Sequence, residues 1–345
     1  MARTTRSSGA KKKAPVRDRS LLWRWGFVLR TCNPPPGKVD VVSKWLVLVR
    51  ACVFPLTVTS AAVGGLLAVG ADGFDPWLFG LAGAGLLIAH SANNLMNDLF
   101  DLESSIDTQN YPRALYAPHP VLSGLISKGG LAAASLVANV LSLAVLVVLT
   151  LERGWPVIAF ALGGFVISAG YAAPPLRLKK RGLGEPGVFV VWGPLMVGGT
   201  YFSATGSIPG EVIAASVPYA LLATTVLMGK HIDKLPWDGP GHIGTLPVLL
   251  GESAARRITL GMMAGFYVSL GACVAFGALP LPSLVALGAV PRLIEVWRAY
   301  GRPRPSEPPK GYPVWPLWFA PAAFVHARRA GALFLAGLGI AAAIR

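Results

Sequence analysis

Residues 76–100 read PWLFGLAGAGLLIAHSANNLMNDLF, and the first charged side chain in this stretch is Asp98. An α-helix rises about 1.5 Å per residue, so about 20 uncharged residues are enough to cross the hydrocarbon core of a bilayer. The stretch is therefore expected to form a membrane-spanning helix. Its end coincides with the start of an acidic segment, which raises the question of what acids do at the end of such a helix.

Similar apolar runs lie on both sides of this one along the chain. The nine predicted spans are approximately Val42–Gly70, Pro76–Phe100, Leu131–Leu151, Pro156–Ala173, Gly184–Ser203, Val212–Gly229, Ile258–Phe276, Pro282–Trp297 and Ala330–Ile344. The aromatic-rich segment Trp315–Val325 is expected to lie in the membrane interface. These runs predict an all-α integral membrane protein with about nine transmembrane helices in a bundle.

The composition agrees with a membrane protein. Of 345 residues, 53% are hydrophobic and only 14% are charged, with a mean hydropathy of +0.56. A soluble globular domain carries about 25% charged residues, so an ordinary soluble enzyme and a disordered chain are both excluded. The three cysteines have no metal-ligand spacing, and we interpret Cys32, Cys52 and Cys273 as packing residues.

The positive charge is sorted along the chain. The formal net charge is +15, and 27 of the 31 basic residues lie in the segment up to Lys44 or in the loops after the second, fourth, sixth and eighth spans. The alternate loops contain one basic residue, Arg153. Basic loops face the cytoplasm, so the amino terminus and the basic loops are predicted to be cytoplasmic and the carboxyl terminus to lie outside. No nucleic-acid partner is needed to explain the charge.

Residues 1–40 are expected to be a basic cytoplasmic tail, disordered or interfacial, ahead of a polytopic domain at 41–345. A short interfacial helix is predicted at Leu21–Leu29, ending before the run Pro34–Gly37. The natural partner for such a tail is the head-group region of membrane lipids.

The acids are few, so their positions are informative. Six of the 16 lie in two groups at the ends of the second and sixth spans, on the same predicted side: Asp98, Asp101, Glu103 and Asp107, then Asp233 and Asp238. Carboxylates so close together repel one another unless they share a cation. Oxygen ligands without cysteine or histidine clusters favour Mg²⁺ over zinc, and Mg²⁺ commonly completes its shell with phosphate oxygens and water.

The metal-ligating candidates differ in how they are brought together. Asn94, Asp98 and Asp101 are spaced by four and three residues, so they share one helical face. Pro236 is expected to break the helix between Asp233 and Asp238, so that a loop would bring these two together. The predicted metal ligands, for two Mg²⁺ ions, are Asn94, Asp98, Asp101, Asp107, Asp233 and Asp238.

Basic residues beside these acids suggest a diphosphate ligand. Two Mg²⁺ ions and several cationic side chains could neutralise a leaving pyrophosphate. The diphosphate-binding candidates, with Asn94, are Arg50, Arg113, Arg177, Lys179, Lys180, Lys230 and Lys234. Arg50 lies inside the first span, where an arginine is costly unless it faces a cavity. For Arg181 and other basic loop residues, simple topology signalling is the alternative.

Three further stretches extend the pattern. They are YAAPPLRLKKRGLGE at 171–185, TLPVLLG at 245–251 and RALYAPHPVLSG at 113–124. With the segment Asn94–Asp107, they resemble the UbiA superfamily of intramembrane prenyltransferases over roughly Lys44 to the end. The gap from Asp101 to Asp107 is most similar to the menaquinone-type naphthoate branch.

The resemblance implies a nine-helix bundle around a cavity open to the cytoplasm and to lipid. It also implies transfer of a prenyl group from a polyprenyl diphosphate to an aromatic or lipid-like acceptor, with Mg²⁺ bound and pyrophosphate released. The implied catalytic residues are Asp98, Asp101, Asp233, Asp238, Tyr171 and His231. Tyr171 and Trp237 are candidates to steady an allylic cation, and His231 to accept a proton or position a substrate. His90, within a span, is expected to pack or to bond to a neighbouring helix.

Two features depart from the family pattern. The family's second motif usually has two aspartates four residues apart, whereas Asp233 and Asp238 are five apart and follow Lys230 and His231. Counting back from Thr245, Asp238 holds the position of the family's second aspartate and Asp233 is displaced by one. The loop Tyr300–Arg329 has no counterpart that we can assign.

Two other functions remain open at this point. A membrane terpene cyclase on the same scaffold would use the prenyl diphosphate without an acceptor. A transporter or channel would place its acids near the bilayer midplane, whereas these acids cluster at the span ends.

Overall fold

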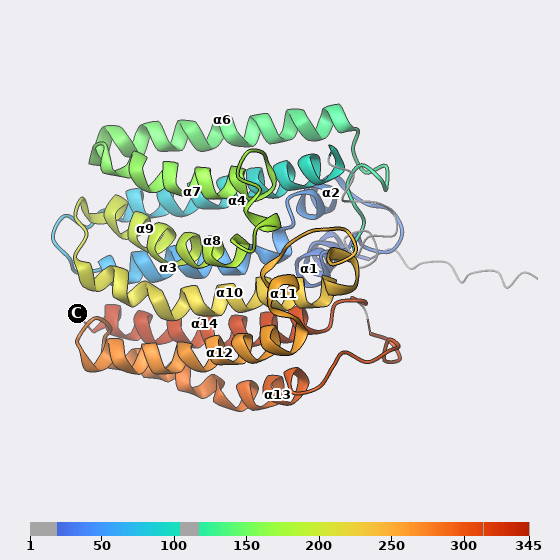
Figure 1. Ribbon diagram of the computed structural model, residues 1–345. Helices are drawn as coiled ribbons and strands as arrows, with labels where there is room; N and C mark the ends of the chain where they lie inside the picture. Colours follow the sequence, from blue (N-terminus) through green and yellow to red (C-terminus); the bar gives the residue numbers. More distant parts are fainter. Residues whose placement is uncertain (1–18, 104–116, 313, 345) are drawn as a thin grey trace, which may run out of the picture.

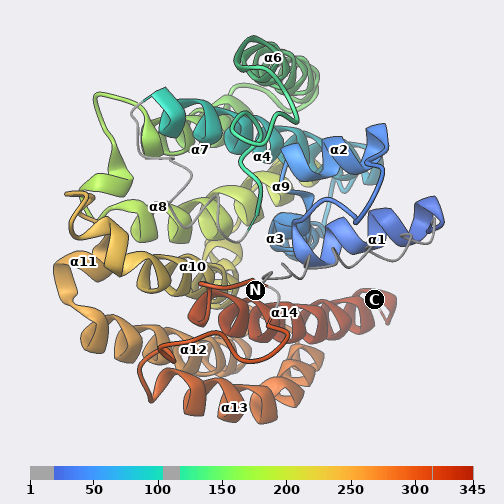
Figure 2. The same ribbon diagram turned by 90° about the vertical axis from the view of Figure 1, so that its right-hand side faces the viewer.

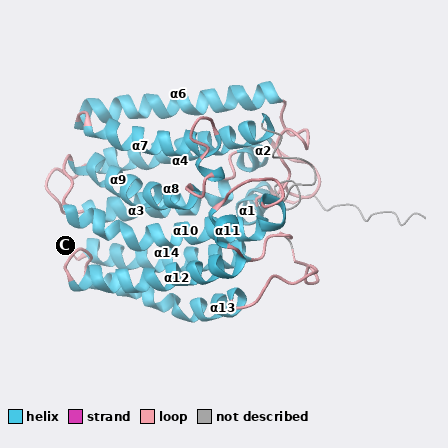
Figure 3. Ribbon diagram, in the orientation of Figure 1, coloured by secondary structure: helices cyan, strands magenta, loops and turns pink. Residues whose placement is uncertain are grey.

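The computed structural model describes residues 19–103, 117–312 and 314–344, and these residues form helices and no strand (Figures 1 and 3). The elements are α1 Leu21–Thr31, α2 Val41–Leu48, η1 Ala51–Val53, α3 Phe54–Ala68, α4 Pro76–Glu103, α6 Lys128–Arg153, α7 Pro156–Ala172, η2 Leu178–Lys180, α8 Gly184–Val190, η3 Val191–Leu195, α9 Met196–Thr205, α10 Gly210–Asp238, α11 Leu246–Leu250, α12 Glu252–Ala275, η4 Leu281–Ala289, α13 Val290–Tyr300 and α14 Phe319–Ala343.

The long helices lie side by side in one bundle, and the described loops gather at its two ends (Figures 1 and 2). Helix α1 and the loop after α13 lie at one end, and the carboxyl terminus lies at the other (Figure 1). Each predicted span corresponds to a helical segment, and within the described residues five segments are long and apolar enough to cross a membrane. The integral membrane bundle is confirmed, while the number of nine crossings stays a prediction.

Two expectations about local structure are wrong. The run Val42–Gly70 is not one helix, because α2 ends at Leu48 and Arg50 adopts a left-handed backbone with φ 53° before η1 begins. The segment Trp315–Val325 includes the start of α14 at Phe319, and its place in the membrane interface stays a prediction. Cys32 and Cys52 form a disulfide between the end of α1 and η1, so they are more than packing residues.

The outer surface of the bundle is apolar. Helix α6 exposes large aliphatic side chains along its length, among them Leu136, Val140, Leu143 and Val147. Helix α10 packs against both α12 and α14 and buries most of its own length. An apolar exterior costs nothing against lipid, so this arrangement suits a bundle embedded in a bilayer.

Polar side chains inside the bundle bond to neighbouring helices. His90 Nδ1 on α4 lies 2.7 Å from Thr57 Oγ1 on α3, so the expected helix–helix hydrogen bond is confirmed. Ser60 on α3 donates to the carbonyl oxygen of Trp192 at 2.6 Å. That carbonyl belongs to η3, a π-helical turn that contains Pro194 and joins α8 to α9. These bonds satisfy polar groups that lipid could not solvate.

Arg153, the one basic residue in the alternate loops, has a structural reason to be there. Its guanidinium donates to the carbonyl oxygens of Ser203 and Ala204 in the last turn of α9, at 3.0 and 2.9 Å. It also donates to the carbonyl oxygen of Gly73 before α4, at 2.9 Å. This side chain therefore ties the end of α6 to the last turn of α9 and to the loop before α4, at the end of the bundle that carries the carboxyl terminus.

Replacing Arg153 with Met, which keeps most of the aliphatic stem, is expected to destabilise the fold by about 1–3 kcal/mol, because three carbonyl groups lose a charged donor. The measurement is thermal unfolding of the purified protein in detergent. Arg298→Met is the matched control, since Arg298 is exposed on α13. Equal unfolding temperatures for the two variants would contradict the role of Arg153.

Candidate functional site

The first acidic motif lies at the end of α4, and the two residues between α2 and η1 contact it. Asp98 is fully buried and forms an ion pair with Arg50. Asn94, one turn earlier, donates its amide N–H to the carbonyl oxygen of Val49 at 2.9 Å. The left-handed backbone at Arg50 turns the chain so that both contacts form. Arg50 thus interrupts a predicted span to reach the first motif.

The basic loop after α7 reaches the same motif. Lys179 is 5% exposed, and its Nζ lies 3.0 Å from Oδ2 of Asp101. Arg177 has a left-handed backbone with φ 43° and is exposed, and Lys180 is half-buried. Lys179 is therefore the residue of this loop that the structure places directly on a predicted metal ligand.

The loops after α7 and α10 touch through their backbones. Arg181 and Gly244 form a parallel bridge between them. A Cβ atom on Gly244 would lie 2.6 Å from the carbonyl oxygen of Lys180, so only glycine permits this approach. The basic loop is thereby fixed beside the second acidic motif.

Helix α10 does not end before the second motif. It runs through Pro236 to Asp238, and the helical bonding resumes beyond the proline, where Gly239 N–H donates to the carbonyl oxygen of Leu235 at 3.2 Å. The predicted break at Pro236 is therefore wrong. A proline so near a helix end removes one hydrogen bond, and here the rest of the long helix persists.

On this continuous helix, Asp233 and Asp238 lie on different faces. Lys234 and Asp238 are both buried, and both act electrostatically on His231. Lys234 also acts on Asp101, and Asp238 on Tyr171. Asp238 and Lys234 therefore face the first motif. Lys230, one turn before Lys234, lies on the same face of α10.

Three side chains form a buried hydrogen-bonded chain beside the acids. Nδ1 of His231 lies 2.7 Å from Oε1 of Glu185, and Nε2 of His231 lies 3.2 Å from the hydroxyl of Tyr171. Glu185 and His231 are 2% and 1% exposed. A carboxylate accepts from N–H, so Nδ1 carries the proton and Nε2 accepts from Tyr171. Both ring nitrogens are engaged, which leaves His231 no atom for a metal ion.

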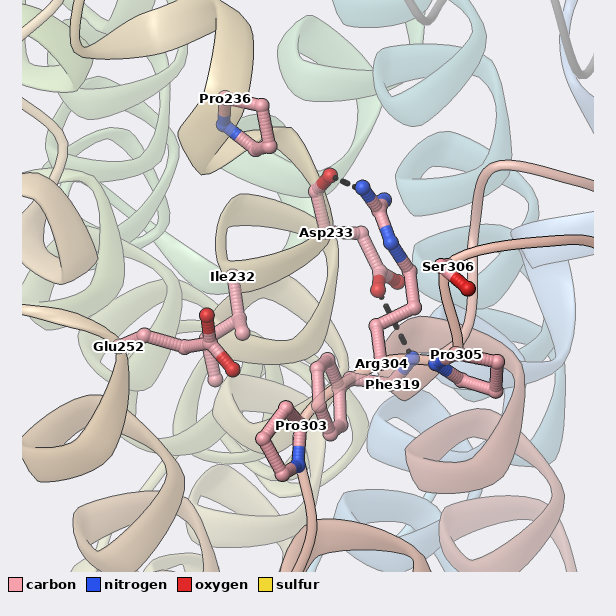
Figure 4. A pocket seen from close by; sticks show the side chains of 9 residues that line it. All are labelled: Ile232, Asp233, Pro236, Glu252, Pro303, Arg304, Pro305, Ser306 and Phe319. Atoms are coloured by element: carbon pink, nitrogen blue, oxygen red, sulfur yellow. Dashed lines mark hydrogen bonds between the residues drawn. The ribbon is translucent and has the colours of Figure 1, made fainter.

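Asp233 is directed toward Phe319 and Arg304 (Figure 4). Its two carboxylate oxygens accept from the backbone N–H groups of Phe319 and Ala320, at 3.0 and 2.9 Å. These are the first residues of α14, so Asp233 satisfies N–H groups that have no partner within that helix and suits its positive end. This corrects the expectation that Asp233 and Asp238 converge.

Arg304 holds the loop between α13 and α14 against the side of α10 that carries Asp233. Arg304 donates to the carbonyl oxygens of Asp233 and Pro316, at 3.0 and 2.9 Å (Figure 4). Its guanidinium lies 5.7 Å from the ring of Trp237 and 5.2 Å from that of Trp315. Trp237, a candidate to steady an allylic cation, is thus engaged with this loop.

In this loop, burial and the nearby charge of Asp233 raise the pKa of Tyr312 to about 12. Its phenol therefore stays neutral at physiological pH.

Sequence reasoning did not select Glu185, Arg304 and His119 as functional. Glu185 lies at the end of the stretch 171–185 and is one of only 16 acidic residues, so its position in the sequence could have indicated a functional role. His119 is 1% exposed, and its Nε2 lies 3.3 Å from the backbone oxygen of Asp98. The predicted residues Asp107 and Arg113 lie outside the described residues.

Comparisons with known proteins identify the family of this chain. The sequence model of the UbiA prenyltransferase family matches residues 57–320. Digeranylgeranylglyceryl phosphate synthase of Natronomonas pharaonis is 31% identical over 235 residues, which cover 66% of this chain and 75% of that protein. The 1,4-dihydroxy-2-naphthoate octaprenyltransferase of Haemophilus influenzae is 28% identical over 230 residues, covering 63% of this chain and 72% of that protein.

The fold agrees as well. The structure of a UbiA homolog from Archaeoglobus fulgidus bound to GPP and Mg²⁺ has a TM-score of 0.59 and 15% identity, covering 86% of this chain and 99% of that one. The chain therefore belongs to the UbiA prenyltransferase family, as its motifs predicted, and is an integral membrane prenyltransferase.

Proposed function

We propose that this chain transfers a prenyl group from a polyprenyl diphosphate to an aromatic or lipid-like acceptor, in a Mg²⁺-dependent reaction that releases pyrophosphate. The observation that carries the proposal is the pairing of Asp98 with Arg50 and of Asp101 with Lys179 at one end of an apolar bundle, where the charges of Asp101 and Asp238 both act on Tyr171. The transferase names of the relatives support it, and they do not favour the cyclase alternative.

The donor set suits Mg²⁺. It consists of the carboxylates of Asp98, Asp101 and Asp238 and the amide oxygen of Asn94, whose amide nitrogen is committed to Val49. Among the described residues, no three His, Cys, Asp or Glu side chains lie close enough to enclose an ion by themselves. An ion held here would therefore complete its shell with diphosphate oxygens and water, as Mg²⁺ commonly does. When bound, it would supply positive charge to the leaving diphosphate.

The cationic side chains would bind the diphosphate and stabilise its departure. Lys179 lies beside Asp101 and Arg50 beside Asp98, and the charge of Lys234 acts on Asp101, so all three could act on a diphosphate bound at these acids. Arg177, Lys180 and Lys230 lie farther along the same loop and helix. Charge that develops on the leaving oxygens is stabilised best by donors already in position.

The helices would protect the allylic cation and accept its tail. A cation formed between apolar helices is shielded from water that would capture it, and Tyr171 would offer an aromatic face. The acceptor must lose a proton when it bonds to the prenyl carbon. Nε2 of His231, oriented by Glu185, would receive that proton through the hydroxyl of Tyr171.

The charge distribution supports an orientation with the amino terminus and this site on the cytoplasmic side and the carboxyl terminus outside. The basic segment 1–40 would then lie against anionic head groups, with α1 joined to η1 by the disulfide between Cys32 and Cys52.

The purified protein, incubated with Mg²⁺, allylic diphosphates of graded length and membrane-lipid extract as the acceptor source, is expected to yield a lipid heavier by whole isoprene units. Mass spectrometry of the extract identifies it, and pyrophosphate release accompanies it. Chelating Mg²⁺ with excess EDTA is expected to abolish both signals. Formation of a cyclised hydrocarbon without any acceptor would contradict the transferase proposal and favour the cyclase.

A further inference from the structure

The register of α10 decides which side chains of the second motif reach the diphosphate. Successive residues of an α-helix turn by about 100°, so residues four apart lie within about 40° of each other and residues five apart differ by about 140°. Lys234 is four residues before Asp238, and Asp233 is five. On a helix that continues to Asp238, Lys234 therefore shares a face with Asp238 while Asp233 lies on another.

The contacts agree with the register. Asp233 is occupied by α14, through Phe319 and Ala320, and its own carbonyl oxygen is occupied by Arg304. It is 1% exposed, and its bonds stabilise the start of α14. Asp233 thus has a structural role on the far side of α10, and turning its carboxylate toward the first motif would break both bonds to the start of α14.

Lys234 occupies the position on the site face where a second carboxylate would have to lie. It is 4% exposed, and its charge acts on Asp101 and on His231. Lys179 is already 3.0 Å from Asp101. A divalent ion placed on this side would be repelled by both ammonium groups and would have only Asp238 as a carboxylate ligand from α10.

We propose that Lys234 replaces a metal ion: the site binds a single Mg²⁺, and the ammonium group of Lys234 binds the diphosphate on the α10 side. This rests on the proposed function, and it revises the two ions expected from sequence. A lysine suits this purpose because its ammonium group is a compact point charge that binds phosphate oxygens well. Among the described residues, Asn94, Asp98, Asp101 and Asp238 remain the candidate ligands of the single ion.

The test counts bound ions on the full chain in detergent. Mn²⁺ replaces Mg²⁺, and geranyl S-thiolodiphosphate, an inert analogue, replaces the donor. Equilibrium dialysis with elemental quantification of manganese is expected to give one ion per chain at saturation. Two ions per chain would overturn the proposal. The count covers the whole chain, so it includes any ligand contributed by residues 104–116.

Variants separate the roles of the three residues. Lys234→Asp places a carboxylate four residues before Asp238 and is expected to bind a second Mn²⁺. Lys234→Met is expected to keep one ion and to weaken binding of the analogue about tenfold. Asp238→Asn is expected to weaken Mn²⁺ binding at least about tenfold, whereas Asp233→Asn leaves both the count and the affinity unchanged.

Two outcomes contradict the proposal at this level: a folded Lys234→Asp chain that still binds one ion, or loss of Mn²⁺ affinity in Asp233→Asn. If Lys234→Asp does not fold, the ion count of the wild-type protein and the analogue binding of Lys234→Met test the proposal. The counts need neither acceptor nor turnover. If the protein forms the transfer product but binds two ions, only the proposed metal count is overturned. If it binds one ion but forms no transfer product, only the proposed function is overturned.

Discussion

Replacing Asp101 with Asn is expected to lower kcat for pyrophosphate release by about 10²–10³-fold while the protein stays folded. Asp101 is the predicted metal ligand that also receives Lys179, at 3.0 Å. The amide keeps the size of the side chain and can still accept a bond from Lys179, so the buried ammonium is not left alone. What the variant loses is the negative charge that holds the ion beside the leaving group.

Asp98→Asn is expected to behave in the same way. Removal of Asp98 altogether would be a weaker experiment, because an unpaired arginine at this depth would destabilise the fold and confuse the result. The measurements are initial rates of pyrophosphate release across a Mg²⁺ titration, with thermal unfolding as the check on folding. Asp72→Asn is the matched control, since Asp72 is exposed in the loop between α3 and α4. Turnover at the wild-type rate in Asp101→Asn would contradict the site.

The first motif was predictable because its geometry is local. Asn94, Asp98 and Asp101 follow helical spacing along one apolar run, so their shared face follows from the sequence alone. The bundle was predictable for the same reason, since apolar length and basic loops are local signals. For Arg50 the sequence favoured contact with a diphosphate or an acceptor over a structural ion pair. The structure pairs it with Asp98, and the contact with a diphosphate stays a prediction.

The second motif was not predictable because its geometry depends on distant residues. Pro236 reads as a break, and whether a helix continues past a proline depends on packing that no local pattern reveals. The partners of Asp233 are more than 80 residues away, at the start of α14. Its spacing of five from Asp238 was the visible sign of a different role, and the sequence did not disclose that role.

Replacing Tyr171 with Phe is expected to lower kcat for product formation about 10²-fold and to leave KM for the donor nearly unchanged, because only the hydroxyl that passes the proton to His231 is removed. Since ionisation of the donor precedes loss of the proton, the variant should still release pyrophosphate. The ratio of transfer product to pyrophosphate should therefore fall well below one, with prenyl alcohol making up the difference.

Glu185→Gln is expected to give the same uncoupling, because an amide holds His231 Nδ1 less firmly and does not stabilise a protonated ring. The matched control is Tyr267→Phe, which removes a hydroxyl that lies 2.9 Å from Nε2 of His326, between α12 and α14. That pair has the same chemistry outside the acidic cluster, so its loss should leave the product ratio unchanged.

Equal ratios in all three variants would mean that the chain from Glu185 to Tyr171 only stabilises the fold. A ratio lowered in Tyr171→Phe and Glu185→Gln alone requires that this chain accept the proton, since a purely structural bond affects stability and not the fate of the cation.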